Sequence, residues 1–111
     1  MKSRLACLPI LGLSLLLMSA GARAEIVVGA ILAETGPGAS LGIPYKNALQ
    51  IMKLKIGDEP VRFVVLNDGT DPTTSVQNAR KLVIDEKVDV IIGPSNTPQT
   101  LAVVEFANEL K

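Results

Sequence analysis

The sequence predicts an α/β fold in which a parallel sheet is built from strands that alternate with helices, in the order βαβαβα. Short apolar runs recur at 26–32, 61–66 and 88–92. They are rich in β-branched residues, as is typical of strands buried in a parallel sheet. A polar turn and then a segment of helical apolar spacing follow each run. Right-handed crossovers would place the three strands parallel, as half of an open doubly wound sheet.

The first strand is expected at 26–32, where the sequence IVVGAIL is apolar throughout. A glycine-rich turn follows at 33–42. We expect the first helix to begin at Pro44, because proline is favoured at the first helical position, and to end before the turn residues at 57–60. Its inward stripe is predicted to consist of Ala48, Ile51 and Met52.

The second strand is predicted at 61–66, and the polar turn 67–72 follows it. Asp68 is interpreted as an Asx-turn residue, and Asp71 as the N-cap of a helix whose first residue is Pro72. That helix should run to about residue 87. Its apolar stripe is predicted to be Val76, Ala79, Leu82 and Val83.

The third strand is expected at 88–92 and ends at Gly93-Pro94. Thr97 occupies the expected N-cap of the third helix, with Pro98 at its first position. The core face of this helix is predicted to comprise Leu101, Val103 or Val104, Ala107 and Leu110.

Residues 1–24 have the organisation of a secretory signal peptide, which leaves 25–111 as the folded part. A basic start precedes an apolar stretch at 5–18, and Ala22-Arg23-Ala24 is a small-x-small cleavage site. The leader therefore predicts an exported protein.

Composition excludes several classes of function for the mature part. The only cysteine, Cys7, lies in the leader, and the chain has no histidine, so thiol chemistry and zinc sites are not expected. Removal of Lys2, Arg4 and Arg23 leaves 8 basic against 11 acidic residues, a net charge of about −3. A nucleic-acid partner is not expected, and neither a metal nor a cofactor is predicted.

The turns at 33–42, 67–72 and 93–97 should meet at the carboxyl ends of the strands, where open α/β sheets bind ligands. The third turn offers an anion site, because a helix N-terminus presents free amide groups and a partial positive charge. Ser95, Asn96 and Thr97 add polar groups beside it. The alternative is that Thr97 only caps the helix.

Two enzymatic interpretations are weaker. Gly36, Gly38 and Gly42 resemble a dinucleotide-binding turn, which would indicate a secreted nucleotide-dependent enzyme of Rossmann type. Three residues separate the strand from Gly36, however, and Glu34 would repel phosphate. Acid–base catalysis has little support, since Asp68 and Asp71 have structural explanations and no histidine is present. We therefore predict that the chain is not an enzyme.

Three motifs follow one another along the chain: TGPGASLG at 35–42, NDGTDP at 67–72 and VDVIIGPSNTP at 88–98. In this order they resemble the start of a periplasmic substrate-binding protein of the leucine/isoleucine/valine-binding type, which belongs to the branched-chain amino acid ABC transporter family. The resemblance implies a periplasmic location. The resemblance covers the mature chain and implies part of the N-terminal lobe of a type I periplasmic binding protein. It implies a carboxylate-bearing ligand such as an amino acid, and an inner-membrane ABC permease as partner.

The resemblance also implies roles for single residues. A hydroxyl residue at the place of Thr97 contacts the ligand carboxylate, and the position of Leu41, often aromatic, lines the side-chain pocket. Some members have a disulfide at the places of Thr70 and Asn96, which is absent here. Asn96 is thus available as a ligand contact, with a turn role as the alternative. The predicted ligand-binding residues are Thr97, Asn96, Ser95 and Leu41.

The family is roughly three times as long as this chain, so the sequence suggests a truncated copy. An open half-site buries little of a small ligand, and we expect millimolar or undetectable affinity. A fragment without function is the remaining alternative.

Overall fold

The chain alternates strands and helices as its sequence predicts. A computed structural model describes residues 24–110; the predicted leader, 1–24, lies outside them except for Ala24. None of the helices in 24–110 is long and apolar enough to cross a membrane. The elements are β1 (Ile26–Leu32), α1 (Ala39–Ile51), β2 (Lys55–Ile56), β3 (Glu59–Asn67), α2 (Pro72–Ile84), β4 (Val90–Ile92) and α3 (Thr97–Glu109).

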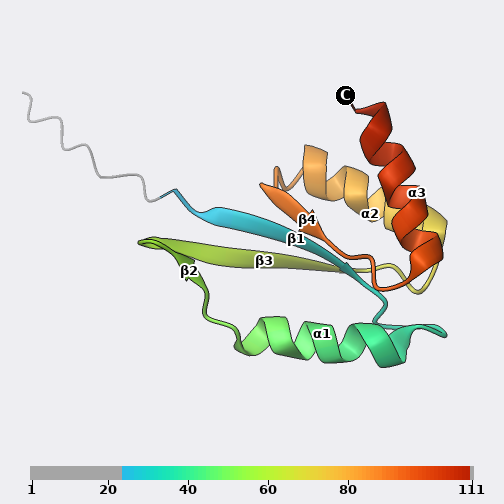
Figure 1. The fold of residues 1–111 in the computed structure, drawn as a ribbon, viewed down its shortest axis with the longest axis horizontal. Helices are drawn as coiled ribbons and strands as arrows, with labels where there is room; N and C mark the ends of the chain where they lie inside the picture. The colour runs from blue at the N-terminus through green and yellow to red at the C-terminus, as the bar shows by residue number, and fades with distance from the viewer. Residues whose placement is uncertain (1–23, 111) are drawn as a thin grey trace, which may run out of the picture.

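The sheet has the strand order β2-β3-β1-β4, with β1 in the interior (Figure 1). β1 pairs in parallel with β3 from Ile26↔Val61 to Leu32↔Asn67, and in parallel with β4 from Val28↔Val90 to Ala30↔Ile92. The three predicted parallel strands are thereby confirmed, and their carboxyl ends lie at one edge of the sheet. The third begins at Val90 rather than at residue 88, because the amide of Val88 donates to the carbonyl of Leu82 instead of the sheet, and Val90 and Ile92 are exposed rather than buried.

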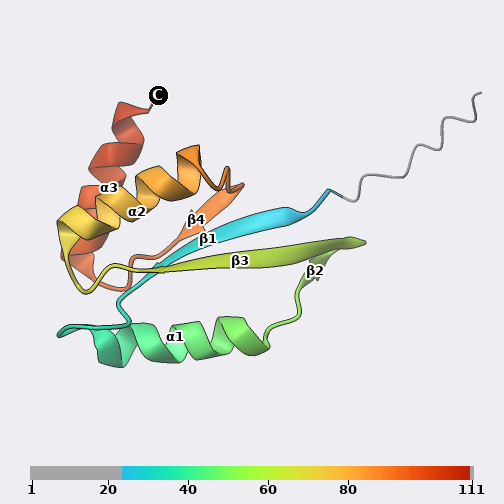
Figure 2. The same cartoon turned by 180° about the vertical axis from the view of Figure 1, so that it is seen from behind.

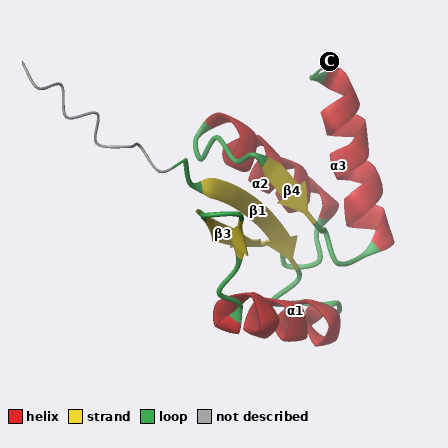
Figure 3. Ribbon diagram, turned by 60° about the vertical axis from the view of Figure 1, so that its left-hand side comes forward, coloured by secondary structure: helices red, strands yellow, loops and turns green. Residues whose placement is uncertain are grey.

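The helices lie on both faces of the sheet. α1 covers one face and α2 the other, and α3 packs against α2 on that side, as the front and back views show (Figures 1 and 2). The buried cluster of Ile31, Ala79, Leu82 and Phe106 forms the core on the side of α2 and α3. Because β1, β3 and β4 are parallel, the turns that follow them all lie at the same edge of the sheet (Figure 3).

The first helix begins at Ala39, five residues before the predicted start at Pro44, which lies inside it. A tight turn starts the helix early: the amides of Leu41 and Gly42 both donate to the carbonyl of Gly38. The predicted inward stripe is also wrong. Ile51 is 84% exposed, and Met52 and Ala48 are exposed as well. Gly42 is the buried residue of α1, so the helix approaches the sheet through its first turns.

The two-residue strand β2 was not predicted from the sequence. It pairs antiparallel with the start of β3, Lys55 with Pro60 and Ile56 with Glu59, around a turn at 57–58. Gly57 has a φ of +62°, which suits a two-residue hairpin. A Gly-Asp pair between short runs is a hairpin signal, but we interpreted it only as the end of a helix.

The predicted start of α2 is confirmed. Asp71 is the N-cap, and its Oδ1 accepts a hydrogen bond of 2.7 Å from the amide of Thr74. That backbone bond, followed by one from the Thr74 hydroxyl, lowers the pKa of Asp71 below the ordinary value of 3.8. The helix ends at Ile84 rather than near residue 87, and Val83, predicted for the apolar stripe, is 39% exposed.

The contact face of α3 differs from the predicted one. Its buried residues are Gln99 and Phe106, and Val103 packs against the core. Phe106 lies under the Arg80 guanidinium of α2, 4.9 Å from the ring centroid. On the predicted core face, Leu101, Val104, Ala107 and Leu110 are exposed. Apolar residues occur all round this helix, so packing against α2, rather than periodicity, selects the buried face.

We predict that Gly42→Ala destabilises the fold by about 1–3 kcal/mol, the usual effect of overpacking. A Cβ at Gly42 would collide with the backbone of Ala33. Chemical unfolding measures the change, with the exposed α1 residue Ser40 changed to Ala as control. At an open helix position Gly→Ala stabilises, so a gain in stability from Gly42→Ala would contradict the close approach of α1.

We also predict that the contribution of Asp71 to stability depends on pH. Its folded pKa lies below the unfolded value, so the stabilisation is present above the unfolded pKa and is lost as the pH falls through the folded one. Asp71→Asn can cap without titrating. The Tm difference between wild type and Asp71→Asn should therefore shift in favour of the variant on acidification.

Thermal unfolding over a range of acidic pH values measures this difference. Asp58→Asn, at an exposed turn carboxylate, serves as the control. A Tm difference between wild type and Asp71→Asn that stays constant with pH would refute the proposed role of the carboxylate.

Candidate functional site

The polar turns at the carboxyl ends of β1, β3 and β4 are joined to one another by hydrogen bonds. The amide of Asp68 donates to the carbonyl of Leu32 at 3.0 Å, which links the second turn to the end of β1. The amide of Ala33 lies 3.4 Å from Ser95 Oγ, a long contact between the first and third turns. Parallel pairing thus brings together the three segments that the sequence predicts to converge.

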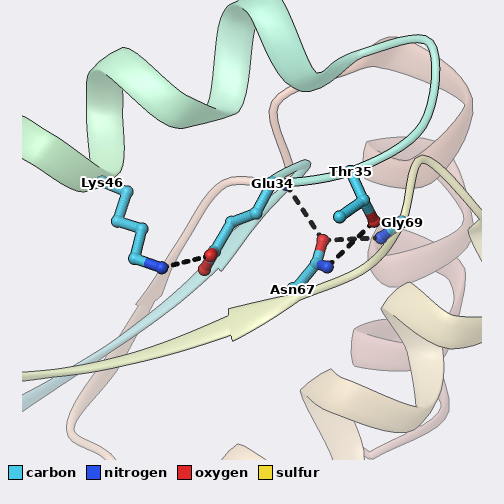
Figure 4. Close-up of polar contacts among 5 residues, drawn as sticks. All are labelled: Glu34, Thr35, Lys46, Asn67 and Gly69. Carbon is cyan, nitrogen blue, oxygen red and sulfur yellow. Dashed lines mark hydrogen bonds and ion pairs between the residues drawn. The ribbon is translucent and has the colours of Figure 1, made fainter.

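Asn67, the last residue of β3, ties the first turn to the second (Figure 4). Its Oδ1 accepts from the amides of Glu34 and Gly69, both at 2.9 Å. Its Nδ2 donates to Thr35 Oγ1 at 3.0 Å. One side-chain amide therefore satisfies two backbone donors on different turns, which holds the turns at a defined separation.

The Glu34 carboxylate forms an ion pair with Lys46 of α1 (Figure 4). Both side chains are half-buried. The pair offsets a negative charge that would otherwise oppose an anionic ligand at this edge, and it fixes the first turn to α1.

Asp68 and Asp71, the carboxylates considered for catalysis, both have structural partners. Asp68 is 1% exposed; its Oδ1 accepts from the amide of Thr70 at 2.8 Å, and its Oδ2 from the Ser75 hydroxyl at 2.9 Å. The Asx turn predicted at Asp68 is confirmed. Asp71 caps α2. Neither arrangement has the form of a catalytic acid–base pair.

The glycines of the first turn serve close packing. A Cβ at Gly38 would collide with Asn96 Nδ2, and one at Gly36 with the carbonyl of Gly69. Because α1 begins at Ala39 rather than at Pro44, the glycine-rich turn leads directly into the helix, as it does in a dinucleotide-binding turn. The space beside Gly36 and Gly38 is nevertheless filled by the second and third turns, so these glycines do not open onto a phosphate site.

At the start of α3, Asn96 is the N-cap and Thr97 is the first helical residue. The prediction that Thr97 is the cap is therefore wrong by one residue. The Asn96 carbonyl accepts from the amide of Thr100 at 3.0 Å, the first bond of the helix. Asn96 makes no side-chain cap, so the amides of Thr97 and Gln99 are among the donors that a helix start leaves unpaired. Pro98 has no amide hydrogen.

The four predicted ligand-binding residues lie in different surroundings. Leu41, 49% exposed, lies with Asn96 in a hollow of about 450 Å³. Ser95 lies instead in an apolar groove of about 350 Å³ beside α1, with Tyr45 and Met52. Thr97 is exposed at the start of α3 and lines neither of these two cavities.

Asn96 points partly into the protein. Its Nδ2 is buried, lies against Gly38 and has no hydrogen-bond partner among residues 24–110. This inward position supports the turn role of Asn96 more than direct ligand contact. Thr97 is exposed and is not the cap of the helix. Their part in ligand binding remains a prediction.

Sequence reasoning missed the residues that connect the turns, namely Asn67, Thr70, Gln99 and Lys46. An asparagine at the end of a strand, directly before an Asp-Gly turn, was the available signal. The partners of Asn67 in the first turn, Glu34 and Thr35, however, lie more than thirty residues away in the chain. Local patterns do not reveal such pairs.

Comparisons with known proteins agree with this architecture. Residues 25–111 match the family model described as periplasmic binding protein. A search of curated proteins returned no match. An extracellular ligand-binding receptor from Rhodopseudomonas palustris HaA2 is similar in structure, with a TM-score of 0.72 and 50% identity over 78% of this chain and 24% of its own.

Two further solved structures are similar at lower identity. The leucine binding protein LivK of Thermotoga maritima MSB8 has a TM-score of 0.69 and 28% identity, over 76% of this chain and 25% of its own. An ABC transporter solute binding protein of R. palustris BisB5, in complex with 3,4-dihydroxybenzoic acid, has a TM-score of 0.67 and 26% identity, over 77% and 24%.

The chain spans about a quarter of the length of these relatives. The matched part is an α/β unit of the type I periplasmic binding protein fold, in agreement with the predicted fold class. Since the family model covers all of residues 25–111, the chain belongs to the periplasmic binding protein family.

Proposed function

We propose that this chain supplies one wall of a binding site for a small solute that carries a carboxylate, such as an amino acid or an aromatic acid. The observation that carries the proposal is the start of α3, where the exposed Thr97 begins a helix that has no side-chain cap, beside three interconnected turns. A helix N-terminus of this kind favours an anion.

The relatives support a carboxylate. One is named as a leucine binding protein, and another was solved with 3,4-dihydroxybenzoic acid. Both ligands carry a carboxylate, although the remainder of each differs in shape and polarity. A group that recognises the shared carboxylate fits both.

Thr97 is proposed as the principal contact. Its hydroxyl can donate to a carboxylate oxygen while its own amide donates to the other. Leu41 is proposed as apolar lining for the remainder of the solute, and Ser95 and Asn96 as flanking polar groups. Ser95 borders the neighbouring groove beside α1 and accepts a long contact from the amide of Ala33, so its hydroxyl is proposed to donate to the solute from that side.

The proposed biological role is that of the solute-binding component of an ABC import system. The binding protein would act in the periplasm, after removal of residues 1–24, and deliver its solute to an inner-membrane permease. Binding rather than catalysis is proposed, because the carboxylates of the turns are engaged in caps and turn bonds.

The expected affinity is low. The chain would supply only one wall of the proposed site, since it covers about a quarter of the length of its relatives. A ligand held on one side keeps much of its surface in water, which weakens its polar contacts. Whether a longer or a truncated protein acts in the cell does not alter the proposed contact at Thr97.

Thr97→Val tests the proposal. Loss of a hydrogen bond to a charged group weakens binding by about 1.5–3 kcal/mol. Titration of the isotope-labelled chain with leucine and with 3,4-dihydroxybenzoate should shift the amide resonances of Thr97 and Gln99 in wild type. The same shifts in Thr97→Val should require far higher ligand concentrations.

Leucinamide, which lacks the carboxylate, is the matched ligand control, and Thr73→Val, at an exposed position of α2, is the matched protein control. Equal shifts with leucine and leucinamide would contradict carboxylate recognition. Unchanged affinity in Thr97→Val would remove Thr97 from the site.

A further inference from the structure

Thr70 has an unusual backbone conformation. Among residues 24–110, the non-glycine residues with positive φ are Thr70, at 64°, and Lys87, at 49°. Lys87 is an exposed, unbranched residue shortly after the end of α2. Thr70 is β-branched, and for such residues the left-handed region is a genuine outlier. Strain of this kind persists only where the surroundings enforce it.

Four hydrogen bonds hold Thr70 in this conformation. Its amide donates to Asp68 Oδ1 at 2.8 Å within its own turn. Its hydroxyl donates to the carbonyl of Thr35 at 2.9 Å and accepts from the amide of Gly38 at 3.0 Å. Its carbonyl accepts from Gln99 Nε2 of α3.

These bonds connect the first turn to the start of α3 through a single residue. Gln99 is 3% exposed, so its bond to Thr70 is sheltered from water. The two contacts to the first turn need a hydroxyl, which both donates and accepts. Glycine would relieve the backbone strain at this φ, but it has no hydroxyl.

We propose that Thr70 is a positioning residue that sets the separation between the first turn and the N-terminus of α3. It thereby places Leu41 of the first helix relative to Thr97 of the third. The effect on binding rests on the function proposed above, whereas the effect on the distance between the two segments does not.

The test compares Thr70→Val, Thr70→Gly and Thr70→Ser in the full chain. Valine keeps the shape without the hydroxyl. Glycine readily adopts the positive φ of residue 70, so Thr70→Gly can be measured in place of Thr70→Val if the valine variant does not fold. Serine restores the hydroxyl. Thr73→Val, at an exposed site, is the matched control.

The structural readout is the nuclear Overhauser effect between the α-hydrogens of Gly38 and the side-chain amide of Asn96, which lie in contact in wild type. The effect should persist in Thr70→Ser and Thr73→Val and disappear in Thr70→Gly and Thr70→Val. Its persistence in Thr70→Gly would overturn the proposal.

The binding readout uses leucine and 3,4-dihydroxybenzoate as probes. Thr70→Gly should bind roughly tenfold more weakly than wild type, because the site loses its preorganisation, and Thr70→Ser should bind as wild type does. Unchanged affinity in Thr70→Gly would overturn the positioning role and leave the proposed function intact. If wild type binds neither probe, the proposed function fails for these ligands, and the Gly38–Asn96 readout alone decides the role of Thr70.

Discussion

The arrangement of this edge depends on the need of buried and half-buried polar groups to find hydrogen-bond partners. Three strands end side by side, and each delivers backbone amides and carbonyls into irregular turns that have no sheet ladder to satisfy them. Asn67, Asp68 and Thr70 meet this need, since their side chains bond amides of their own turn and of the first turn. The turns are therefore held together without a covalent link among the described residues.

This constraint explains why the start of α3 is the candidate site. The amides of Glu34 and Gly38 donate to side chains of the second turn, and that of Gly69 donates to Asn67 within its own turn. Those of Thr97 and Gln99 belong to a helix start that has no side-chain cap. The Lys46–Glu34 ion pair also removes an uncompensated negative charge nearby. The backbone amides at the start of α3 are hydrogen-bond donors, and such donors favour an anion.

The fold follows closely from local patterns, and the exceptions have physical reasons. The β-branched runs and the Asp71-Pro72 cap depend on neighbours in sequence, so they were predictable. The buried faces of α1 and α3 were not predictable, because each helix carries apolar residues on all its sides and only packing selects the face that is buried. Leu101 and Ile51 are exposed for this reason, whereas Gly42 and Phe106 make the contacts.

The site was predictable only in part, for the same reason. Convergence of the turns follows from parallel topology, and the start of α3 was placed within one residue. The bonds of Asn67 and Thr70 to the first turn join residues more than thirty positions apart, and spacing in the sequence carries no trace of them. The inward position of the Asn96 side chain likewise depends on Gly38 of the first turn, where a Cβ would collide with Asn96 Nδ2.

Amide hydrogen exchange in the ligand-free protein tests the central claim most directly, because it reads both sets of amides at once. The account predicts slow exchange at Glu34 and Gly38, whose hydrogen bonds join the turns, and fast exchange at the exposed Thr97. Fast exchange at Glu34 and Gly38, or protection of Thr97 without ligand, would contradict it.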